Sequence, residues 1–279
     1  MDIVGYQITR PGNEPTSKET MPALKRLRKI QEQPSTGDDT SKGSFILTRL
    51  LDEVAAPLDE SAGLCQRLLD GSGGKLSLEQ RKWVEAVSTG AQRSAQRLKD
   101  YVDLMLLEAG EFVLRPEVHS LAEDIDQAAR QWKPAVRAKG LHLVIEPALQ
   151  SLPPVLADPA RVAQVLSTLI ANAIKFTDHG QVTVSTELYD RSIALHVVDT
   201  GTGIPAAQLP RLFEDFYQGE GVKALDPFGC GLGLTLSRRV VIRLGGDLWA
   251  TSTVGAGSKF SFTVPRAPGA AGQSRLAPV

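Results

Sequence analysis

One candidate for ligand binding is an acidic residue followed by two glycines. Asp199 opens the sequence DTGTGIP and ends an apolar stretch, residues 193–199, that predicts a strand. A carboxylate at this point can accept a hydrogen bond from an exocyclic amine, and Gly201 and Gly203 allow the backbone to approach a ligand closely. Many tight turns after strands share this composition, so alone the pattern fits an ordinary turn equally well.

A second candidate is the glycine-rich sequence GCGLGL, residues 229–234. It leads into a predicted helix over residues 231–244, whose first backbone N–H groups and positive dipole end suit a phosphate group. The GxGxxG order of dinucleotide-binding folds is absent, and the segment before it is a loop rather than a strand. Taken alone, this pattern is weakly specific.

A third candidate lies near the end of a helix predicted over Pro159–Phe176, with Asp158 as its N-cap. Asn172 offers a carboxamide oxygen, a hard ligand suited to Mg²⁺ that is bound to phosphates. Lys175 can meet phosphate charge. Taken alone, such a pair is better interpreted as a solvated helix end.

Five motifs follow one another in an order that resembles the histidine-kinase ATPase domain, a relative of DNA gyrase, Hsp90-type chaperones and mismatch-repair ATPases. They are NAIKFT (172–177), DTGTGIP (199–205), LFEDFYQ (212–218), GCGLGL (229–234) and GSKFSFTVP (257–265). With the helical segment before them, the resemblance covers residues 44–265. It implies an α+β fold: a helical hairpin that forms a four-helix bundle on dimerisation, followed by an α/β sandwich of the ATPase type.

The resemblance implies ATP and Mg²⁺ as ligands and assigns roles to the motif residues. Asp199 would bind the adenine amine and select ATP over GTP, and Gly201 and Gly203 would line the base pocket. Asn172 would ligate Mg²⁺, and Lys175 would face the phosphates.

The remaining roles fall on the two later motifs. Backbone contacts to phosphate would come from the glycine-rich loop, at Gly229, Gly231, Leu232 and Gly233. Phe213 and Phe216 would pack the root of a mobile lid over residues 219–228, in which Lys223 is the single cation.

The chain departs from the family pattern beside the expected metal ligand. Thr168 stands one turn before Asn172, where the family carries another Asn or an acidic residue. Gyrase-like relatives use a glutamate there to activate water. Threonine lacks that basicity, which disfavours ATP hydrolysis of the gyrase or chaperone type.

The segment before the ATPase motifs predicts two antiparallel helices. Steps of four and three separate Leu47, Leu51, Val54, Leu58, Ser61, Cys65 and Leu68, and the same spacing resumes after the GSGG turn at Val84, Val87, Ala91, Ser94, Leu98, Tyr101 and Met105. Gly110 ends the second helix. A hairpin alone buries one stripe per helix, so we expect a homodimer or a paired partner that completes a four-helix bundle. The alternative is a monomeric hairpin folded against the C-terminal domain.

The first of these helices lacks the residue that gives the family its name. In the family it carries a phospho-accepting histidine in a pattern like His-Glu-x-Arg-Thr-Pro-Leu. The matching stretch is DEVAAPL, residues 52–58, so Asp52 takes the histidine position and Glu53 follows it. Ala56 replaces the threonine that the family links to dephosphorylation of a partner. Pro57 removes a helical hydrogen bond to the Glu53 carbonyl and predicts a kink.

The expected organisation is a flexible tail (1–41), the dimerisation hairpin (42–112), the ATP-binding domain (113–266) and a disordered tail (267–279). Within the ATP-binding domain, strands are expected at residues 141–146, 181–187, 193–199, 247–252 and 258–265. Helices covering such a sheet make an α+β sandwich.

Bulk properties exclude several classes of function. A net charge of −1 gives no electrostatic case for a nucleic-acid partner. The two cysteines lie far apart and fit a reduced, cytoplasmic compartment. No apolar run is long enough for a membrane span, so direct membrane insertion is not expected.

Two functional hypotheses follow. In the first, the chain is a histidine-kinase-family signalling protein of two-component systems that binds Mg-ATP and passes phosphate to a histidine on a partner. In the second, it is a catalytically silent pseudokinase, a dimeric scaffold that regulates a partner histidine kinase or a response regulator. A gyrase-like or chaperone-like ATPase is a third reading, weakened by Thr168 and by the hairpin.

Overall fold

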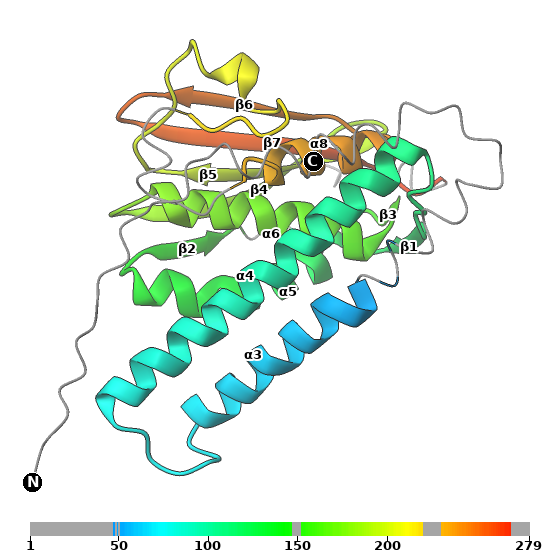
Figure 1. Ribbon diagram of the computed structural model, residues 1–279. Coiled ribbons are helices and arrows are strands. Elements are labelled where there is room, and N and C mark those ends of the chain that lie inside the picture. Colours follow the sequence, from blue (N-terminus) through cyan, green and yellow to red (C-terminus); the bar gives the residue numbers. More distant parts are fainter. Residues whose placement is uncertain (1–46, 48, 50, 147–151, 220–229, 269–279) are drawn as a thin grey trace, which may run out of the picture. The chain divides into compact units, whose positions relative to one another are not determined.

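The computed structural model describes residues 47, 49, 51–146, 152–219 and 230–268. All the labelled helices and strands lie in one unit of the chain, Leu50–Val279 (Figure 1). The class is α+β, as expected. The two expected tails lie outside the described residues, apart from 267 and 268. Ala267 is buried and its N–H donates to the Pro154 carbonyl at 2.9 Å, so the packed domain reaches one residue past the expected boundary.

The helical part is the expected antiparallel hairpin. Helix α3 (Ala56–Leu69) and helix α4 (Leu78–Ala109) pack side by side and are joined by a glycine-rich turn (Figure 1). A capping box starts α4, with the Ser77 hydroxyl accepting from the Gln80 N–H and the Gln80 side chain accepting from the Ser77 N–H. Gly110, at φ 75°, ends α4 in the left-handed conformation, as its position in the sequence predicts.

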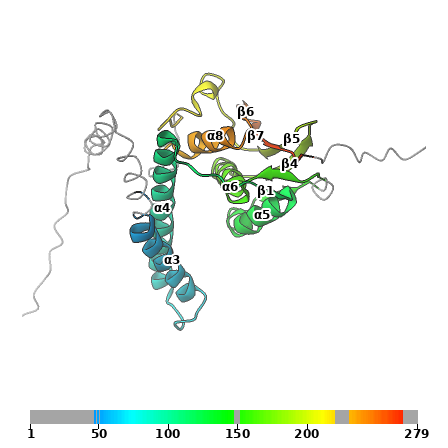
Figure 2. The ribbon, with the colours of Figure 1, turned by 90° about the vertical axis from the view of Figure 1, so that its right-hand side faces the viewer.

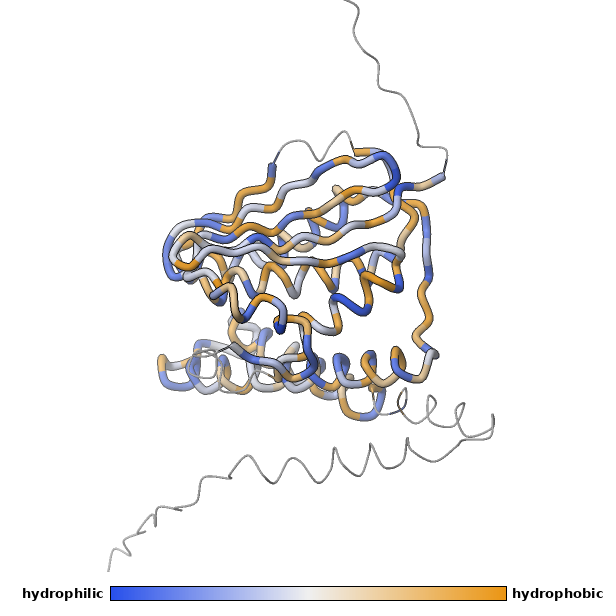
Figure 3. The backbone as a smooth tube through the Cα atoms, turned by 90° about the horizontal axis from the view of Figure 1, so that it is seen from above, coloured by the Kyte–Doolittle hydropathy of each residue, from blue (hydrophilic) through white to orange (hydrophobic). Residues whose placement is uncertain are grey.

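Several of the buried residues in the hairpin are small. The buried side chains of the hairpin include Ala55, Ala62, Ser88, Ala91 and Ala95. Of the predicted seam, Ala91 is buried, whereas Val54, Leu68 and Val87 remain exposed. Further apolar side chains, Leu64, Leu78 and Trp83, are exposed as well. Seen from above, hydrophilic and hydrophobic residues alternate along these helices (Figure 3). The hairpin therefore carries an apolar surface that its own two helices leave uncovered.

The irregularity expected from Pro57 takes the form of a π-helical turn. Residues Leu51–Ala55 (η1) are π-helical and lead directly into α3, in which Pro57 is the second residue. Because proline has no N–H, the regular helical bonding pattern cannot continue through this point. The wider turn places Asp52 and Glu53 on the exposed side of the helix.

The second part is a sheet covered by helices on one face (Figures 1 and 2). The strand order is β2-β4-β5-β7-β6; β2 pairs with β4 in parallel and the other pairs are antiparallel. The strands are β2 (His142–Ile145), β4 (Gln181–Leu188), β5 (Ser192–Asp199), β6 (Leu248–Thr253) and β7 (Gly257–Pro265), which match the five expected strands within two residues at each end. The short strands β1 (Glu117–His119) and β3 (Val155–Ala157) pair separately.

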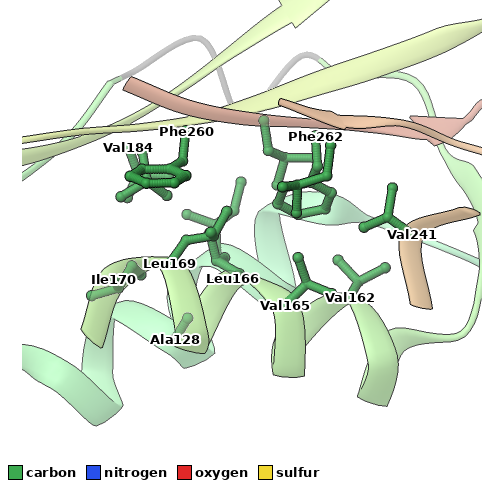
Figure 4. Close-up of a cluster of buried hydrophobic side chains, with 14 of the residues drawn as sticks. Ala128, Val162, Val165, Leu166, Leu169, Ile170, Val184, Val241, Phe260 and Phe262 are labelled. Carbon is green, nitrogen blue, oxygen red and sulfur yellow. The ribbon is translucent and has the colours of Figure 1, made fainter. Parts of the chain in front are cut away.

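The helices on the sheet are α5 (Leu121–Ala138), α6 (Pro159–Phe176) and α8 (Gly233–Arg243). Helix α6 has the predicted bounds, and the Asp158 carboxylate caps it by accepting from the Arg161 N–H. Leu166 and Leu169 of α6 point toward Val184, Phe260 and other apolar side chains of the sheet (Figure 4). Burial of this apolar face fixes how α6 is rotated on the sheet. None of the described helices combines the length and apolar character needed to cross a lipid bilayer.

Candidate functional site

Asp199 is the last residue of β5 and is buried at 4% exposure. Its Oδ1 accepts hydrogen bonds from the backbone N–H groups of Gly201 (2.8 Å) and Ser258 (3.3 Å). Burial raises the pKa of this carboxyl, and the two backbone hydrogen bonds oppose that rise. The Ser258 side chain also hydrogen-bonds to this carboxylate and likewise lowers its pKa. The carboxylate can still accept a further donor, because each of its oxygens has more than one lone pair.

Two glycines let the turn after β5 pack tightly between other parts of the backbone. A Cβ on Gly201 would lie 2.2 Å from the Phe176 carbonyl oxygen at the end of α6. A Cβ on Gly203, at φ 70°, would lie 2.1 Å from the Thr253 carbonyl oxygen. The Gly255 N–H donates to the Thr202 carbonyl at 2.8 Å, which fastens the turn to the β6–β7 hairpin. Any side chain at the two glycines would force this arrangement apart.

Helix α6 presents Asn172 and Lys175 near its C-terminal end, where both line an open cavity. The ammonium of Lys139, at the end of α5, fixes this end of the helix. Its Nζ donates to the carbonyl oxygens of Ile174 (2.9 Å) and Lys175 (3.0 Å). A cation at a helix C-terminus is favourable because it satisfies terminal carbonyls and meets the negative end of the dipole.

The glycine-rich loop comes next to α6 where it enters α8. Gly231 has φ 70°, and Gly233 is the first residue of α8. A Cβ on Gly233 would lie 3.2 Å from the Thr168 methyl group, so the residue that departs from the family pattern contacts the start of this helix. Leu232 is buried at 1% exposure and anchors the loop in the core. Gly229 and Lys223 lie outside the described residues.

The structure separates the two predicted aromatic residues. Phe213 packs against the hydrophobic core, and the Arg238 guanidinium lies 5.2 Å from its ring centroid. Phe216 differs from the expectation: its side chain is half-exposed, and its backbone is left-handed at φ 61°. Tyr217, the next residue, lines the cavity, whereas neither phenylalanine does.

One open cavity of about 1610 Å³ joins most of the predicted site. It brings together residues from α6, the turn after β5 and the glycine-rich loop. The predicted residues that line it are Asn172, Lys175, Asp199, Gly203, Gly231, Leu232 and Gly233. Asp52 of η1 lines the same cavity, while Glu53 is exposed and does not. Gly201 does not line the cavity; it packs the turn after β5 against the end of α6.

Sequence reasoning missed several residues around the cavity. They are Ile204, Leu212, Tyr217, Ser258 and Phe260, together with Trp132 of α5. Five of them, Ile204, Leu212, Tyr217, Ser258 and Phe260, occur within recognised motifs, so a signal for them existed. Trp132 had none, because α5 was not assigned as an element.

The α4 wall of the cavity carries a carboxyl group in an unfavourable setting. The pKa of Asp100 is raised to about 6, mainly by burial and to a smaller extent by the nearby Asp103 carboxylate. A hydrogen bond from Gln96 and the charge of Arg97 work in the opposite direction. Since the pKa in the folded chain exceeds the unfolded value of 3.8, this group favours folding below pH 4. That contribution is lost as the pH rises through 6.

We therefore expect Asp100→Asn to stabilise the chain at pH 7.5 by about 1 kcal/mol, after allowing for partial solvent exposure, and to have little effect near pH 4.5. Asparagine removes the charge and can still accept from Gln96. Urea unfolding at the two pH values measures this. Asp126→Asn, on the exposed face of α5, is the matched control. Equal effects of Asp100→Asn at both pH values would contradict the prediction.

Residues 157–268 match the family model described as Histidine kinase-, DNA gyrase B-, and HSP90-like ATPase. The chain is 34% identical over 226 residues to the aerobic respiration control sensor protein ArcB of Escherichia coli K12. The matched region covers 80% of this chain and 28% of ArcB. It is 32% identical over 231 residues to the circadian input-output histidine kinase CikA of Synechococcus elongatus, and the matched region covers 81% of this chain and 30% of CikA. The chain spans less than a third of the length of these curated relatives.

Solved structures of histidine kinases are similar to this chain as well. Full-length ShkA, crystallised in complex with AMPPNP, superposes with a TM-score of 0.61 at 29% identity, over 79% of this chain and 45% of ShkA. The histidine kinase ThkA in complex with the response regulator TrrA shares the fold, with a TM-score of 0.53 at 21% identity over 85% and 69%.

The sheet, its helices and the motifs around the cavity thus define an ATPase domain of the histidine-kinase, gyrase B and Hsp90 class. The chain as a whole, hairpin included, is a member of the histidine-kinase family.

Proposed function

We propose that the chain binds Mg-ATP in the cavity beside Asp199 and works in two-component signalling without an acceptor histidine of its own. The observation that carries the proposal is that three separate segments, the end of α6, the turn after β5 and the glycine-rich loop, converge on one cavity. Each of these segments resembles a family motif, and the resemblance implies which part of Mg-ATP each segment would contact. That ShkA was crystallised with AMPPNP supports this reading.

Adenine is expected at the buried end of the cavity. The Asp199 carboxylate would accept a hydrogen bond from the exocyclic amine of adenine. Guanine carries a carbonyl oxygen at that position, and two acceptors facing each other would repel. Asp199 therefore gives the site its preference for ATP over GTP.

Phosphates are expected at the glycine-rich loop. The loop leads into α8, whose first backbone N–H groups have no partner within the helix and carry the positive end of its dipole, which suits a phosphate group. Because a Cβ on Gly231 would lie 2.6 Å from the Tyr217 carbonyl oxygen, only glycine keeps this loop against its neighbour. Lys175 lines the same cavity and would add a positive charge.

Asn172 would hold Mg²⁺ through its side-chain oxygen, and the phosphates would supply further oxygen ligands. The fit rests on the hard oxygen donor of Asn172 lining the same cavity as the glycine loop. Bound Mg²⁺ would neutralise phosphate charge. Thr168 donates its hydroxyl hydrogen to the Gln164 carbonyl at 3.0 Å and contacts the start of α8 through its methyl group. It acts as a packing residue, which disfavours hydrolysis of the gyrase type.

Phosphate transfer is expected to go to a histidine on a partner. Asp52 occupies the acceptor position and lines the cavity, but a carboxylate lacks the imidazole nitrogen that the family phosphorylates. A partner histidine kinase that pairs with the hairpin would bring its own acceptor histidine. The cytoplasm is the expected compartment, and a response regulator is the expected downstream partner, as the ThkA complex with TrrA illustrates for a relative of the same fold.

The uncovered apolar surface of the hairpin supports a homodimer. Leu64, Trp83 and Val87 are exposed by 48%, 61% and 59%, although they are large apolar residues on packed helices. A second hairpin would cover them and complete a four-helix bundle. Sedimentation equilibrium of the chain tests this, and a monomer at every concentration would contradict it.

A second candidate function is that of a silent pseudokinase. The observation in its favour is again Asp52, because a chain that never transfers phosphate has no need of an acceptor. In this case nucleotide binding would set the conformation of a dimeric scaffold that regulates a kinase or a response regulator.

A labelling assay separates the two functions. After incubation with ATP labelled in the γ-phosphate, we expect no acid-labile label on the purified chain, because its hairpin offers no histidine. Label on a co-incubated partner hairpin that carries the acceptor histidine would support transfer in trans, and Asp199→Asn should abolish it. Acid-labile label on the isolated chain would contradict the assignment of Asp52. A partner that stays unlabelled would favour the scaffold.

A further inference from the structure

Helix α8 contacts the LFEDFYQ segment, residues 212–218. The Thr235 hydroxyl donates to the carbonyl oxygens of Phe213 (3.1 Å) and Glu214 (2.9 Å). Arg238 adds its contact with the Phe213 ring. These interactions hold the first half of the segment, at Phe213 and Glu214. The second half, from Asp215 onward, is held by a different residue.

That residue is Arg239. Its Nη2 lies 3.0 and 2.8 Å from the two carboxylate oxygens of Asp215, and its Nη1 lies 3.3 Å from Glu108 Oε1 at the end of α4. One guanidinium nitrogen thus contacts both oxygens of the same carboxylate, in a charge-assisted pair. This contact restrains the side chain of Asp215.

The residue that follows Asp215 is strained. Phe216 has φ 61°, a conformation that is unfavourable for a bulky side chain and persists only where neighbours enforce it. Arg239 contacts the preceding residue, Asp215. The Arg211 guanidinium lies 4.4 Å from the ring centroid of the following residue, Tyr217. The strained position is thus clamped on both sides.

The turn at Phe216 and Tyr217 lies directly against the glycine-rich loop. An added Cβ on Gly231 would lie 2.6 Å from the Tyr217 carbonyl oxygen and 2.8 Å from the Phe216 carbonyl carbon. The Tyr217 N–H in turn donates to the Glu214 carbonyl at 3.3 Å. If the strain at Phe216 were released, this backbone would move and Gly231 would lose the surface against which it is placed.

We propose that Arg239 is a positioning residue for nucleotide binding. By holding Asp215, it keeps the strained turn at Phe216 against Gly231 and so fixes the loop that receives the phosphates. The proposal rests on the proposed function, since it concerns the same nucleotide site. Arg239 itself does not line the cavity and acts through Asp215.

The test measures Mg-ATP affinity by calorimetry for the unmutated chain, Arg239→Ala, Asp215→Asn and the double variant. We expect each single change to weaken binding about fivefold, the size of effect of a partly exposed ion pair, and the double variant to be no weaker than either. Hydrogen exchange at the Tyr217 amide should accelerate in all three variants. Urea midpoints should stay close to that of the unmutated chain, which separates positioning from stability.

Two controls sharpen the result. Arg243→Ala removes the same charge from the same helix; Arg243 contacts the Leu107 carbonyl at 3.5 Å and does not touch the segment. Glu108→Gln removes only the α4 contact of Arg239. Both should change affinity less than twofold. Unchanged affinity in Arg239→Ala, an equal loss in either control, or additive losses in the double variant would overturn the proposal. If the unmutated chain binds no nucleotide, the proposed function itself fails.

Discussion

Asp199→Asn is expected to weaken Mg-ATP binding by roughly 50-fold, because it removes a charge-assisted hydrogen bond to the adenine amine inside a buried site. Asparagine keeps an acceptor oxygen for the N–H groups of Gly201 and Ser258, so the turn should stay folded. The cavity-facing atom becomes an amide NH₂, which repels the adenine amine. Calorimetric titration of the variant with Mg-ATP measures the loss.

The control is Asp190→Asn in the exposed β4–β5 turn, which changes the same charge without touching the cavity. Circular dichroism of both variants should match that of the unmutated chain. Affinity retained within threefold in a folded Asp199→Asn chain would show that this carboxylate is not the adenine contact.

Gly203→Ala is expected to have the second large effect. Its Cβ would lie 2.1 Å from the Thr253 carbonyl oxygen, and the residue must also hold φ 70°. The left-handed conformation and the forced separation of the two loops should together destabilise the chain by roughly 2–4 kcal/mol. Nucleotide affinity should fall as well, because the turn that follows Asp199 forms one wall of the cavity. Urea unfolding and calorimetry measure the two effects.

Gly255→Ala separates the two contributions. Gly255 also has a positive φ, 78°, and lies in the loop that Gly203 contacts, but a Cβ there meets nothing within 4 Å. Its substitution should cost about 1 kcal/mol from backbone conformation alone and leave nucleotide affinity unchanged. Equal losses of stability in the two variants would mean that close packing of the turn contributes nothing.

Local sequence signals predicted much of the fold. Asp158 and Pro159 mark the start of α6, and an apolar stripe of helical spacing continues to Phe176, so both ends of that helix follow from the sequence. The five strands of the large sheet were predicted for a similar reason, since each is an apolar stretch bounded by turn residues. The site residues on the turn after β5 and the glycine-rich loop lie in short contiguous motifs, which explains why they could be named in advance.

Other features depend on contacts between distant segments. Helix α5 is absent from the sequence-based expectations. Pro134 within it argues against a continuous helix when only local signals are used, yet the helix runs unbroken and buries Leu121, Ile125 and Ala128. Several alanines of the hairpin are buried, whereas the expected seam residues Val54, Leu68 and Val87 are exposed. Phe216 was expected to pack and is instead half-exposed in a strained turn. Its neighbours on both sides contact arginines, Asp215 contacting Arg239 of α8, and the local sequence does not reveal these contacts.

The measurement that tests the account most directly is a calorimetric titration of the unmutated chain with ATP in the presence of Mg²⁺, followed by the same titration with GTP. The account predicts saturable binding of one ATP per chain and much weaker binding of GTP, because Asp199 accepts from an amine that guanine lacks at that position. No measurable heat up to millimolar ATP, from a chain shown to be folded, would contradict it.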